Sequence, residues 1–293
     1  MSDPRRALVL GSGGLTGLAW EVGVLHGLAG AGVDLASDLV VGTSAGALLG
    51  ARLASGATVD ELAAALLADP LRSAELDEGP RQADPRSHSP FPERRAFLIP
   101  LLAAQFHPDR QRALVWLGRR AAKEWTPERQ AAWLDAIAGD LADRPWPTSL
   151  VVVATDATSG RPVFLGARHA ADLAAAVAAT CALPGVFPAV RVGERLLFDG
   201  GLRSPANLDV AGPADLVLAL APLTGAVRAQ RRPAVQAARL RAVGTRVVLL
   251  TPDAAGRRAI GVDVLAAGRV PAAFEAGQFL GVRRAAEVRA AWC

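Results

Sequence analysis

The pentapeptide Gly42-Thr43-Ser44-Ala45-Gly46 constrains the fold of this chain more than any other segment. It follows the apolar run Leu39-Val40-Val41 and precedes residues 47–54, whose composition favours a helix. A G-x-S-x-G sequence between a strand and a helix forms a turn so tight that only small neighbours fit, and the serine is lifted clear of the sheet. We therefore expect Ser44 in front of a helix N-terminus, whose dipole favours a developing negative charge. The alternative is a structural turn, because short Gly/Ser strings are common in a chain rich in alanine and glycine.

The order of the apolar runs predicts an α/β fold with a mostly parallel central sheet. A strand at 7–10 is followed by a glycine-rich loop at 11–17, a helix at 18–29 and the strand at 39–41. Such an opening makes the strands parallel, with the helices as crossovers. The chain has 293 residues, 51% of them hydrophobic, which suits one domain over residues 1–293. Further strands are expected at 150–155, 162–165, 216–220 and 246–250, with a hairpin at 190–197 around Gly193. Further helices are expected at 109–125, from Pro127 onward, and at 171–179, 228–241 and 272–292.

Residues 69–145 differ in character from the rest of the chain. Prolines punctuate a charged, irregular stretch from 69 to 100, and two helical stretches follow it. The second helix is announced by Thr126 as N-cap and Pro127 at the first helical position. We interpret residues 69–145 as a cap or lid inserted over one end of the sheet. The alternative is an ordinary helical layer of the same domain.

Composition excludes several classes of function. The net charge is only +4, and nearly every cation is an arginine, since Lys123 is the single lysine. A nucleic-acid partner is not indicated, because that would need the charge clustered on one face. The two cysteines, Cys181 and Cys293, have no spacing typical of zinc or of a disulfide framework, so neither a metal nor another cofactor is expected.

The sequence also predicts where the protein works. The N-terminus lacks the apolar core of a signal peptide, and prolines interrupt the longest uncharged stretch, 173–190. We therefore expect a cytoplasmic protein with, at most, peripheral contact with an anionic membrane surface. A basic stretch is the candidate for that contact, and a solvated helix face is the alternative reading. Its arginines are Arg228, Arg231, Arg232, Arg239 and Arg241.

A serine hydroxyl is a poor nucleophile until a neighbouring base takes its proton. Histidine is the usual base, but none of the four histidines lies in a strand-end motif near the C-terminus, and we expect structural roles for all of them. They are His26, His88, His107 and His169. An acid stands out instead, because Asp199 ends an apolar run and is followed by Gly200 and Gly201. On its own, this Asp-Gly pair reads as a turn.

In combination, these motifs resemble the patatin-like phospholipase family. The resemblance begins at the glycine loop, continues through the Ser44 pentapeptide and ends at the Asp-Gly-Gly sequence, covering most of residues 7–55 and 149–222. Residues 223–293 match less specifically. The segments that carry it are 8–17 (LVLGSGGLTG), 42–46 (GTSAG), 154–156 (ATD), 182–188 (ALPGVFP), 199–201 (DGG) and 204–206 (SPA).

The resemblance implies a three-layer α/β/α fold and hydrolysis of acyl ester bonds in phospholipids, lysophospholipids or other carboxyl esters. It implies a catalytic dyad without histidine, in which Ser44 is the nucleophile and Asp199 the base. The backbone N–H groups of Gly13 and Gly14, with that of Ala45, would bind the oxyanion. Supporting roles in the motifs fall to Gly11, Gly17, Gly42, Gly46, Gly200 and Gly201.

One position departs from the family pattern. The family's glycine loop usually carries Arg or Lys where this chain has Thr16. The loop glycines are kept, so the oxyanion site is expected to be intact. What the departure puts in question is any role of that cation in fixing the loop or in attracting an anionic phosphate headgroup.

Two other classes of function stay open from the sequence. The same fold could bind an acyl chain without turning it over, since a fold does not prove an activity. The glycine loop after the first strand also resembles an NAD(P)-binding Rossmann loop. Against that reading, the second strand ends at Gly42 rather than at an acidic residue for the ribose, and the chain contains no tyrosine.

Overall fold

The computed structural model describes residues 4–68, 106–123, 125–169 and 172–292. The expected irregular stretch, together with His88 and Cys293, lies outside the described residues.

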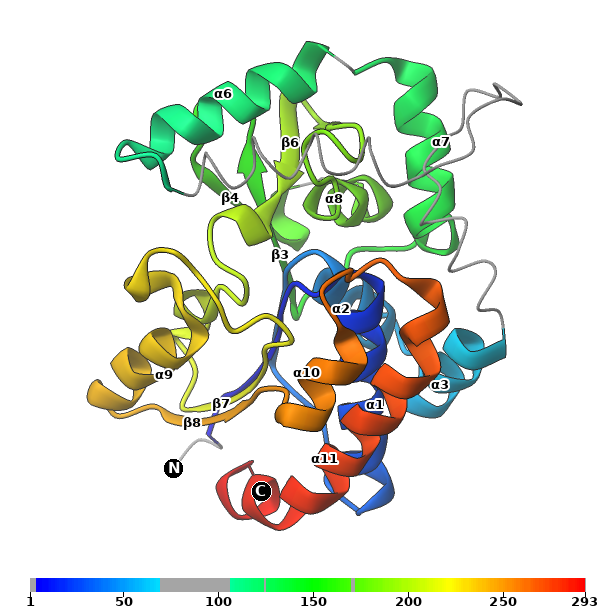
Figure 1. Ribbon diagram of the computed structural model, residues 1–293, viewed down its shortest axis with the longest axis vertical. Helices are drawn as coiled ribbons and strands as arrows, with labels where there is room; N and C mark the ends of the chain where they lie inside the picture. Colours follow the sequence, from blue (N-terminus) through cyan, green and yellow to red (C-terminus); the bar gives the residue numbers. More distant parts are fainter. Residues whose placement is uncertain (1–3, 69–105, 124, 170–171, 293) are drawn as a thin grey trace.

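An eight-stranded, mostly parallel sheet forms the centre of the molecule (Figure 1). The strand order is β5-β6-β3-β2-β1-β7-β8, and β4 pairs with β3 beside this path. Pairing is parallel from β3 through β2, β1 and β7 to β8, and antiparallel for β4, β6 and β5. The strands are β1 (Arg6–Leu10), β2 (Leu39–Gly42), β3 (Leu150–Asp156), β4 (Pro162–Leu165), β5 (Val190–Val192), β6 (Arg195–Asp199), β7 (Leu216–Leu220) and β8 (Arg246–Leu250).

Helices cover both faces of this sheet. The α-helices are α1 (Gly14–Gly30), α2 (Ala45–Ala54), α3 (Val59–Ala68), α6 (Arg110–Lys123), α7 (Pro127–Ala138), α8 (Leu173–Thr180), α9 (Pro233–Ala242), α10 (Ala254–Ile260) and α11 (Val270–Trp292). The 3-10 helices are η1 (Gly139–Leu141), η2 (Ala167–His169), η3 (Gly200–Leu202), η4 (Leu208–Ala211), η5 (Ala229–Arg231) and η6 (Ala267–Arg269).

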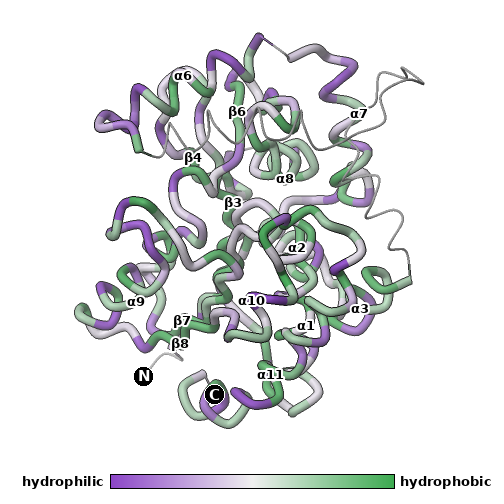
Figure 2. The backbone as a smooth tube through the Cα atoms, in the orientation of Figure 1, coloured by the Kyte–Doolittle hydropathy of each residue, from purple (hydrophilic) through white to green (hydrophobic). Residues whose placement is uncertain are grey.

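The side chains of each strand alternate between the two faces of the sheet, and both faces are covered by helices, which gives three layers. In β1, Leu8 and Leu10 face the core that contains α1, α2, α8 and α11, whereas Ala7 and Val9 face the core that contains η4 and α9. Successive side chains of a strand point to opposite faces, so a strand buried on both sides reads as a continuous apolar run. Figure 2 shows the β7–β8 region as largely hydrophobic, while α6 and α9 carry hydrophilic stretches. The predicted three-layer α/β/α fold is confirmed.

Glycines bring α1 and α11 unusually close together. A Cβ atom added at Gly23 would lie 2.1 Å from the Phe274 carbonyl oxygen, and one at Gly281 would lie 2.3 Å from that of Val24. Side chains cannot be accommodated at such distances, so this helix pair depends on glycine at its crossing. Within the pair, α11 packs against β7 and β8 of the sheet.

The expected strands and the hairpin agree with the structure within one or two residues. The helix ends differ more, for local reasons. The first helix begins at Gly14 rather than at residue 18, because it starts inside the glycine loop. The basic stretch expected as one helix is divided into η5 and α9, since Pro233 occupies the first position of α9. Helices α3 and α10 were not predicted from the sequence.

The described part of residues 69–145 holds two helices on different cores. Helix α6 packs Leu114 and Leu117 against Phe198 of β6. Helix α7 begins as expected, with the Thr126 side chain accepting the N–H of Arg129. It packs beside α8 through the core that contains Trp133.

Candidate active site

Ser44 occupies a tight turn between β2 and α2. Its backbone has φ +54° and ψ −126°, a conformation that non-glycine residues rarely adopt and that costs on the order of 1–3 kcal/mol. The turn leaves no room for larger neighbours, because a Cβ at Gly46 would lie 2.3 Å from the Leu10 carbonyl carbon. At Gly42, a Cβ would lie 2.4 Å from the Ala47 Cα. The strand–turn–helix unit therefore has the form that the pentapeptide predicts.

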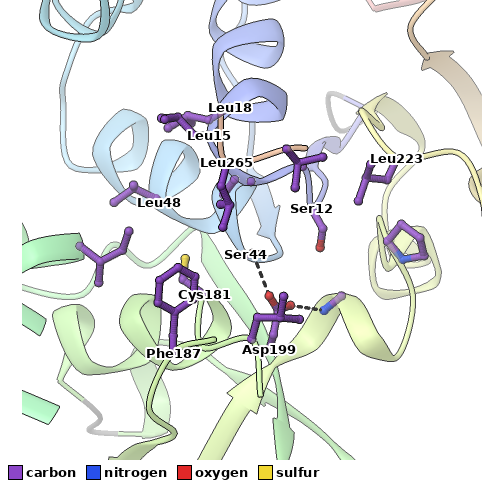
Figure 3. Close-up of a pocket in the computed structure, with 18 of the residues that line it drawn as sticks. Ser12, Leu15, Leu18, Ser44, Leu48, Cys181, Phe187, Asp199, Leu223 and Leu265 are labelled. Atoms are coloured by element: carbon purple, nitrogen blue, oxygen red, sulfur yellow. Dashed lines mark hydrogen bonds between the residues drawn. The ribbon is translucent and has the colours of Figure 1, made fainter. Parts of the chain in front are cut away.

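The turn brings Ser44 to Asp199 at the end of β6. Ser44 Oγ lies 3.0 Å from Asp199 Oδ2, a hydrogen bond across 155 positions of sequence (Figure 3). The other carboxylate oxygen, Oδ1, accepts the Gly201 N–H at 2.6 Å. Both side chains are nearly buried, with Ser44 8% and Asp199 7% exposed. The carboxylate is thus held from one side by η3 and presents its free edge to the serine.

Burial sets the proton affinity of this carboxylate. Desolvation raises the pKa of Asp199 from 3.8 to about 6, against the opposing hydrogen bonds from Gly201 and Ser44. At neutral pH the group is therefore ionised and can only accept hydrogen bonds, so the Ser44 hydroxyl is the donor. A base with a pKa near the working pH is suited to taking a proton and returning it.

Thr180, the last residue of α8, fixes the backbone of the turn. Its Oγ1 accepts the Ser44 N–H at 2.9 Å and donates to the Val153 carbonyl at 2.5 Å. The sequence analysis did not identify this residue. The available signal was its position as the one hydroxyl in the otherwise apolar run 173–180.

Asn207 ties the turn to the loop that follows Asp199. It adopts a left-handed conformation with φ +50°, and its Nδ2 donates to Thr43 Oγ1 at 3.0 Å and to the Ser204 carbonyl at 2.9 Å. Asn207 is fully buried. The sequence analysis stopped one residue short of it, at Ala206, and an asparagine is among the few residues that adopt this conformation readily.

The glycine loop adds backbone donors to the same place. Gly13, Gly14 and Ala45 line the cavity that holds Ser44 and Asp199. Within the described part of the chain, the N–H groups of these three residues donate to no carbonyl or side chain. Unpaired N–H groups of this kind are expected at the start of a helix, and they can bind an anion.

Glu21, about two turns into α1, supports this loop from behind. Its Oε1 accepts the Gly11 N–H at 2.7 Å, and the side chain is fully buried. Oε2 has no hydrogen-bond partner among the described residues. Desolvation raises the pKa of Glu21 well above 4.5, against the lowering effect of the Gly11 hydrogen bond. The sequence signal for this role is a glutamate within a largely apolar helix, and the role was not predicted.

Thr16 occupies the position where the family pattern has a cation. It is fully buried, and its N–H and Oγ1 both donate to the Val264 carbonyl, at 3.0 and 3.3 Å. In this chain Thr16 therefore anchors the glycine loop to the segment before α11, and it does not line the cavity that holds Ser44.

An apolar cavity of about 240 Å³ opens beside Ser44. Polar groups gather at one end, where Ser12, Ser44 and Asp199 lie, and the remaining walls are largely hydrocarbon (Figure 3). Helix α7 contributes Trp133, whose ring stacks on Phe187 with centroids 4.1 Å apart. The other apolar walls come from Leu15, Leu18, Leu48, Ile137, Leu183, Leu202, Leu223, Val264 and Leu265.

The described histidines lie away from Ser44. His26 contacts Gln278 and Asp60, His107 bonds to Asp109, and His169 accepts the N–H of Gly166. None of them lines the cavity. Among the described residues, no group of three or more His, Cys, Asp or Glu side chains is arranged to hold a metal ion. Cys181 lies in the cavity wall as a free thiol.

Comparison with known proteins agrees with the resemblance. The family model described as patatin-like phospholipase matches residues 8–211. NTE family proteins of Mycobacterium tuberculosis and Mycobacterium bovis, both described as uncharacterized, are 30% identical over 224 residues. That match covers 75% of this chain and 49% of theirs, so the chain spans about half the length of these relatives.

Two solved structures are more distant. VipD from Legionella pneumophila has a TM-score of 0.42 at 14% identity, covering 75% of this chain and 50% of VipD. The type III effector protein ExoU has a TM-score of 0.38 at 18% identity, covering 98% of this chain and 54% of ExoU.

No helix in the described ranges is long and apolar enough to cross a membrane. The family model described as patatin-like phospholipase matches a range that includes both the Ser44 turn and Asp199. The chain therefore belongs to the patatin-like phospholipase family.

Proposed function

We propose that this protein hydrolyses acyl ester bonds of lipids, with Ser44 as nucleophile and Asp199 as the base. The observation that carries the proposal is the 3.0 Å hydrogen bond between Ser44 Oγ and Asp199 Oδ2 at the polar end of an apolar cavity. Membership of a lipid hydrolase family supports the same reading. Phospholipids, lysophospholipids and other carboxyl esters all belong to this substrate class.

The first half of the reaction forms an acyl-enzyme. Asp199 takes the Ser44 proton while Oγ attacks the ester carbonyl carbon, and the carbonyl electrons move onto its oxygen. The N–H groups of Gly13, Gly14 and Ala45 would bind that oxyanion, each contributing on the order of 3 kcal/mol. Collapse of the intermediate expels the alcohol, which leaves with the proton from Asp199.

The second half regenerates the serine. Asp199 takes a proton from water, and the resulting hydroxide attacks the acyl carbon. The second tetrahedral intermediate expels Ser44, which recovers the proton from Asp199, and the fatty acid is released. One carboxylate thus alternates between base and acid, as its pKa of about 6 permits.

The cavity suits the acyl chain rather than the whole lipid. Its volume of about 240 Å³ lies below the roughly 300–1,000 Å³ of sites that enclose drug-sized ligands. The headgroup would therefore lie outside, and peripheral contact with a lipid surface is part of the proposal. Trp133 and Ile137 of α7 belong to the cavity wall, which supports a covering role for that part of residues 69–145.

A fluorophosphonate probe tests the nucleophile. We expect it to label wild-type protein at Ser44 and to leave Ser44→Ala unlabelled. A protein that binds fatty acid but is neither labelled nor active on any ester of a chain-length panel would instead be a non-catalytic acyl-binding module. A shift in melting temperature with NAD(P) would support the Rossmann alternative.

A further inference from the structure

Four arginines from three segments converge beside the site. Arg110 begins α6, Arg203 follows η3, and Arg228 and Arg231 lie at η5. Arg203 pairs with Asp209, and Arg231 lies 3.8 Å from the same carboxylate. The Asp209 carboxylate is thus shared by two of the four guanidinium groups.

Arg203 also donates to Asn207 Oδ1 and lies over the Phe164 ring, whereas Arg110 and Arg228 bond to backbone carbonyls. Arg110 Nη2 donates to the Arg203 carbonyl at 2.8 Å, and Arg228 Nη2 donates to the Pro108 carbonyl at 2.8 Å. Within the described ranges, neither Arg110 nor Arg228 contacts a carboxylate. Partial burial and repulsion from Arg231, Arg228 and Arg203 lower the pKa of Arg110 to about 10, so it stays charged at neutral pH. The cluster holds uncompensated positive charge.

The arginines predicted from the sequence do not act as one group. Arg241 bonds to the Val247 carbonyl and Arg232 to that of Ala226. Of the five arginines in that basic stretch, Arg228 and Arg231 belong to the cluster described here.

Large apolar side chains flank the cluster and face solvent. Phe106 is 70% exposed and Val227 41% exposed. Their two segments are joined because Arg228, next to Val227, donates to the carbonyls of His107 and Pro108, which follow Phe106. Trp116, also exposed, lies further along α6 between Arg112 and Arg119. Arginines mixed with exposed aromatic and aliphatic side chains are typical of surfaces that bind anionic bilayers.

This surface is adjacent in sequence to residues that line the cavity. Leu202 and Pro205 both line the cavity, and Arg203 stands between them in sequence. Leu223, at the edge of the cavity in Figure 3, leads into the segment that carries Arg228.

We propose that Arg110, Arg228 and Arg231 of this cluster dock on the phosphate groups of anionic phospholipids at a membrane surface, while Arg203, whose side chain is 12% exposed, stays bound to Asp209 and Asn207. Phe106 and Val227 would enter the interfacial region beside them. The cavity mouth would then face the lipid, and a phosphate-binding cation is supplied here rather than at Thr16. The inference rests on the proposed function only in taking a lipid as the substrate.

Vesicle flotation of the full chain carrying Ser44→Ala tests the docking surface without hydrolysis. One set of vesicles contains phosphatidylcholine alone, and the other contains equal parts of phosphatidylcholine and phosphatidylserine. We expect binding to the anionic vesicles, weakened by salt. Arg110→Gln with Arg228→Gln should weaken it about fivefold for each charge removed. Arg110→Lys with Arg228→Lys should retain most of it.

The matched control is Arg246→Gln with Arg289→Gln. Arg246 begins β8 at the end of the sheet away from the cavity, and Arg289 lies in the last turn of α11, so the same charge is removed elsewhere. Equal binding to both vesicle types, or an equal loss in the control, overturns the docking surface. Melting temperatures verify that each variant is folded. If docking holds but wild-type protein hydrolyses no ester, the proposed function fails while this inference stands.

Discussion

Thr180 Oγ1 accepts the backbone N–H of Ser44 at 2.9 Å, so the end of α8 helps to fix the conformation of the Ser44 turn. The bond matters because Ser44 is held at φ +54°, a conformation that the surrounding structure must impose. Thr180 thus connects α8 to Ser44 without lining the cavity.

Thr180→Val should therefore impair activity without removing a reacting group. It leaves the buried Ser44 N–H unpaired, which costs about 1–3 kcal/mol of stability. We expect a fall in kcat/KM of about tenfold together with a lower melting temperature. Thr245→Val is the control, because Thr245 is also a buried threonine bonded to a carbonyl, that of Ala214, outside the site. An equal activity loss in both variants would show a general stability effect.

The pH dependence of activity should report Asp199. As a base it must be ionised, so kcat/KM on a soluble ester should rise with pH around a midpoint of about 6. A profile that stays flat between pH 4 and about pH 8 would argue against Asp199 as the base.

The ionisation of Asp199 should lower the free energy of unfolding as the pH rises, whereas it raises the activity. Its folded pKa, about 6, lies above the ordinary 3.8, so the folded protein binds this proton more tightly than the unfolded chain does. The resulting stability is present below about pH 4 and is lost as pH rises through 6. Asp199→Asn should therefore melt higher than wild type at neutral pH, with the difference shrinking in acid. Urea unfolding at several pH values measures this.

Glu21 should matter for the loop through its hydrogen bond rather than through charge. Glu21→Gln keeps an oxygen for the Gly11 N–H and should retain most activity, whereas Glu21→Ala should lower kcat by opening a cavity behind the loop. Because burial raises the pKa of Glu21, the wild-type protein should lose stability relative to Glu21→Gln as the pH rises. Equal activity of the Ala and Gln variants would exclude a loop-supporting role.

The cavity wall should set acyl-chain preference. Ile137→Ala enlarges the cavity beside Trp133, and we expect its activity profile to shift toward longer or bulkier acyl groups. Leu141→Ala is the matched control, because Leu141 is buried in the same core but does not line the cavity. Both should cost roughly 2–5 kcal/mol of stability. An unchanged chain-length profile in Ile137→Ala would mean that the acyl group lies elsewhere.

Local signals were sufficient to predict much of the fold. The strands around Val9, Val41 and Leu218 are buried on both faces, so each is a continuous apolar run that is visible in the sequence. Helix α3 was missed because it exposes most of its residues and buries only Ala63. The 3.0 Å approach of Ser44 and Asp199 was expected through the family resemblance, not through local pattern.

The supporting residues were harder to predict for a physical reason. Thr180 and Glu21 accept the backbone N–H groups of Ser44 and Gly11, and Asn207 donates to the side chain of Thr43. The neighbours of these residues in sequence do not specify such partners, because only the folded chain brings the bonded groups together. For Thr180 and Glu21, the signal is a buried polar residue in a largely apolar helix.

The most direct test of the dyad measures single-turnover acylation by a chromogenic ester in wild type, Ser44→Ala and Asp199→Asn. We predict a burst of alcohol release in wild type with acyl mass on Ser44, and no acylation in Ser44→Ala. Asp199→Asn, which keeps the side-chain shape but cannot take the proton, should slow acylation at least a hundredfold. Acylation of Ser44→Ala at the wild-type rate, or a wild-type burst in Asp199→Asn, would contradict the account.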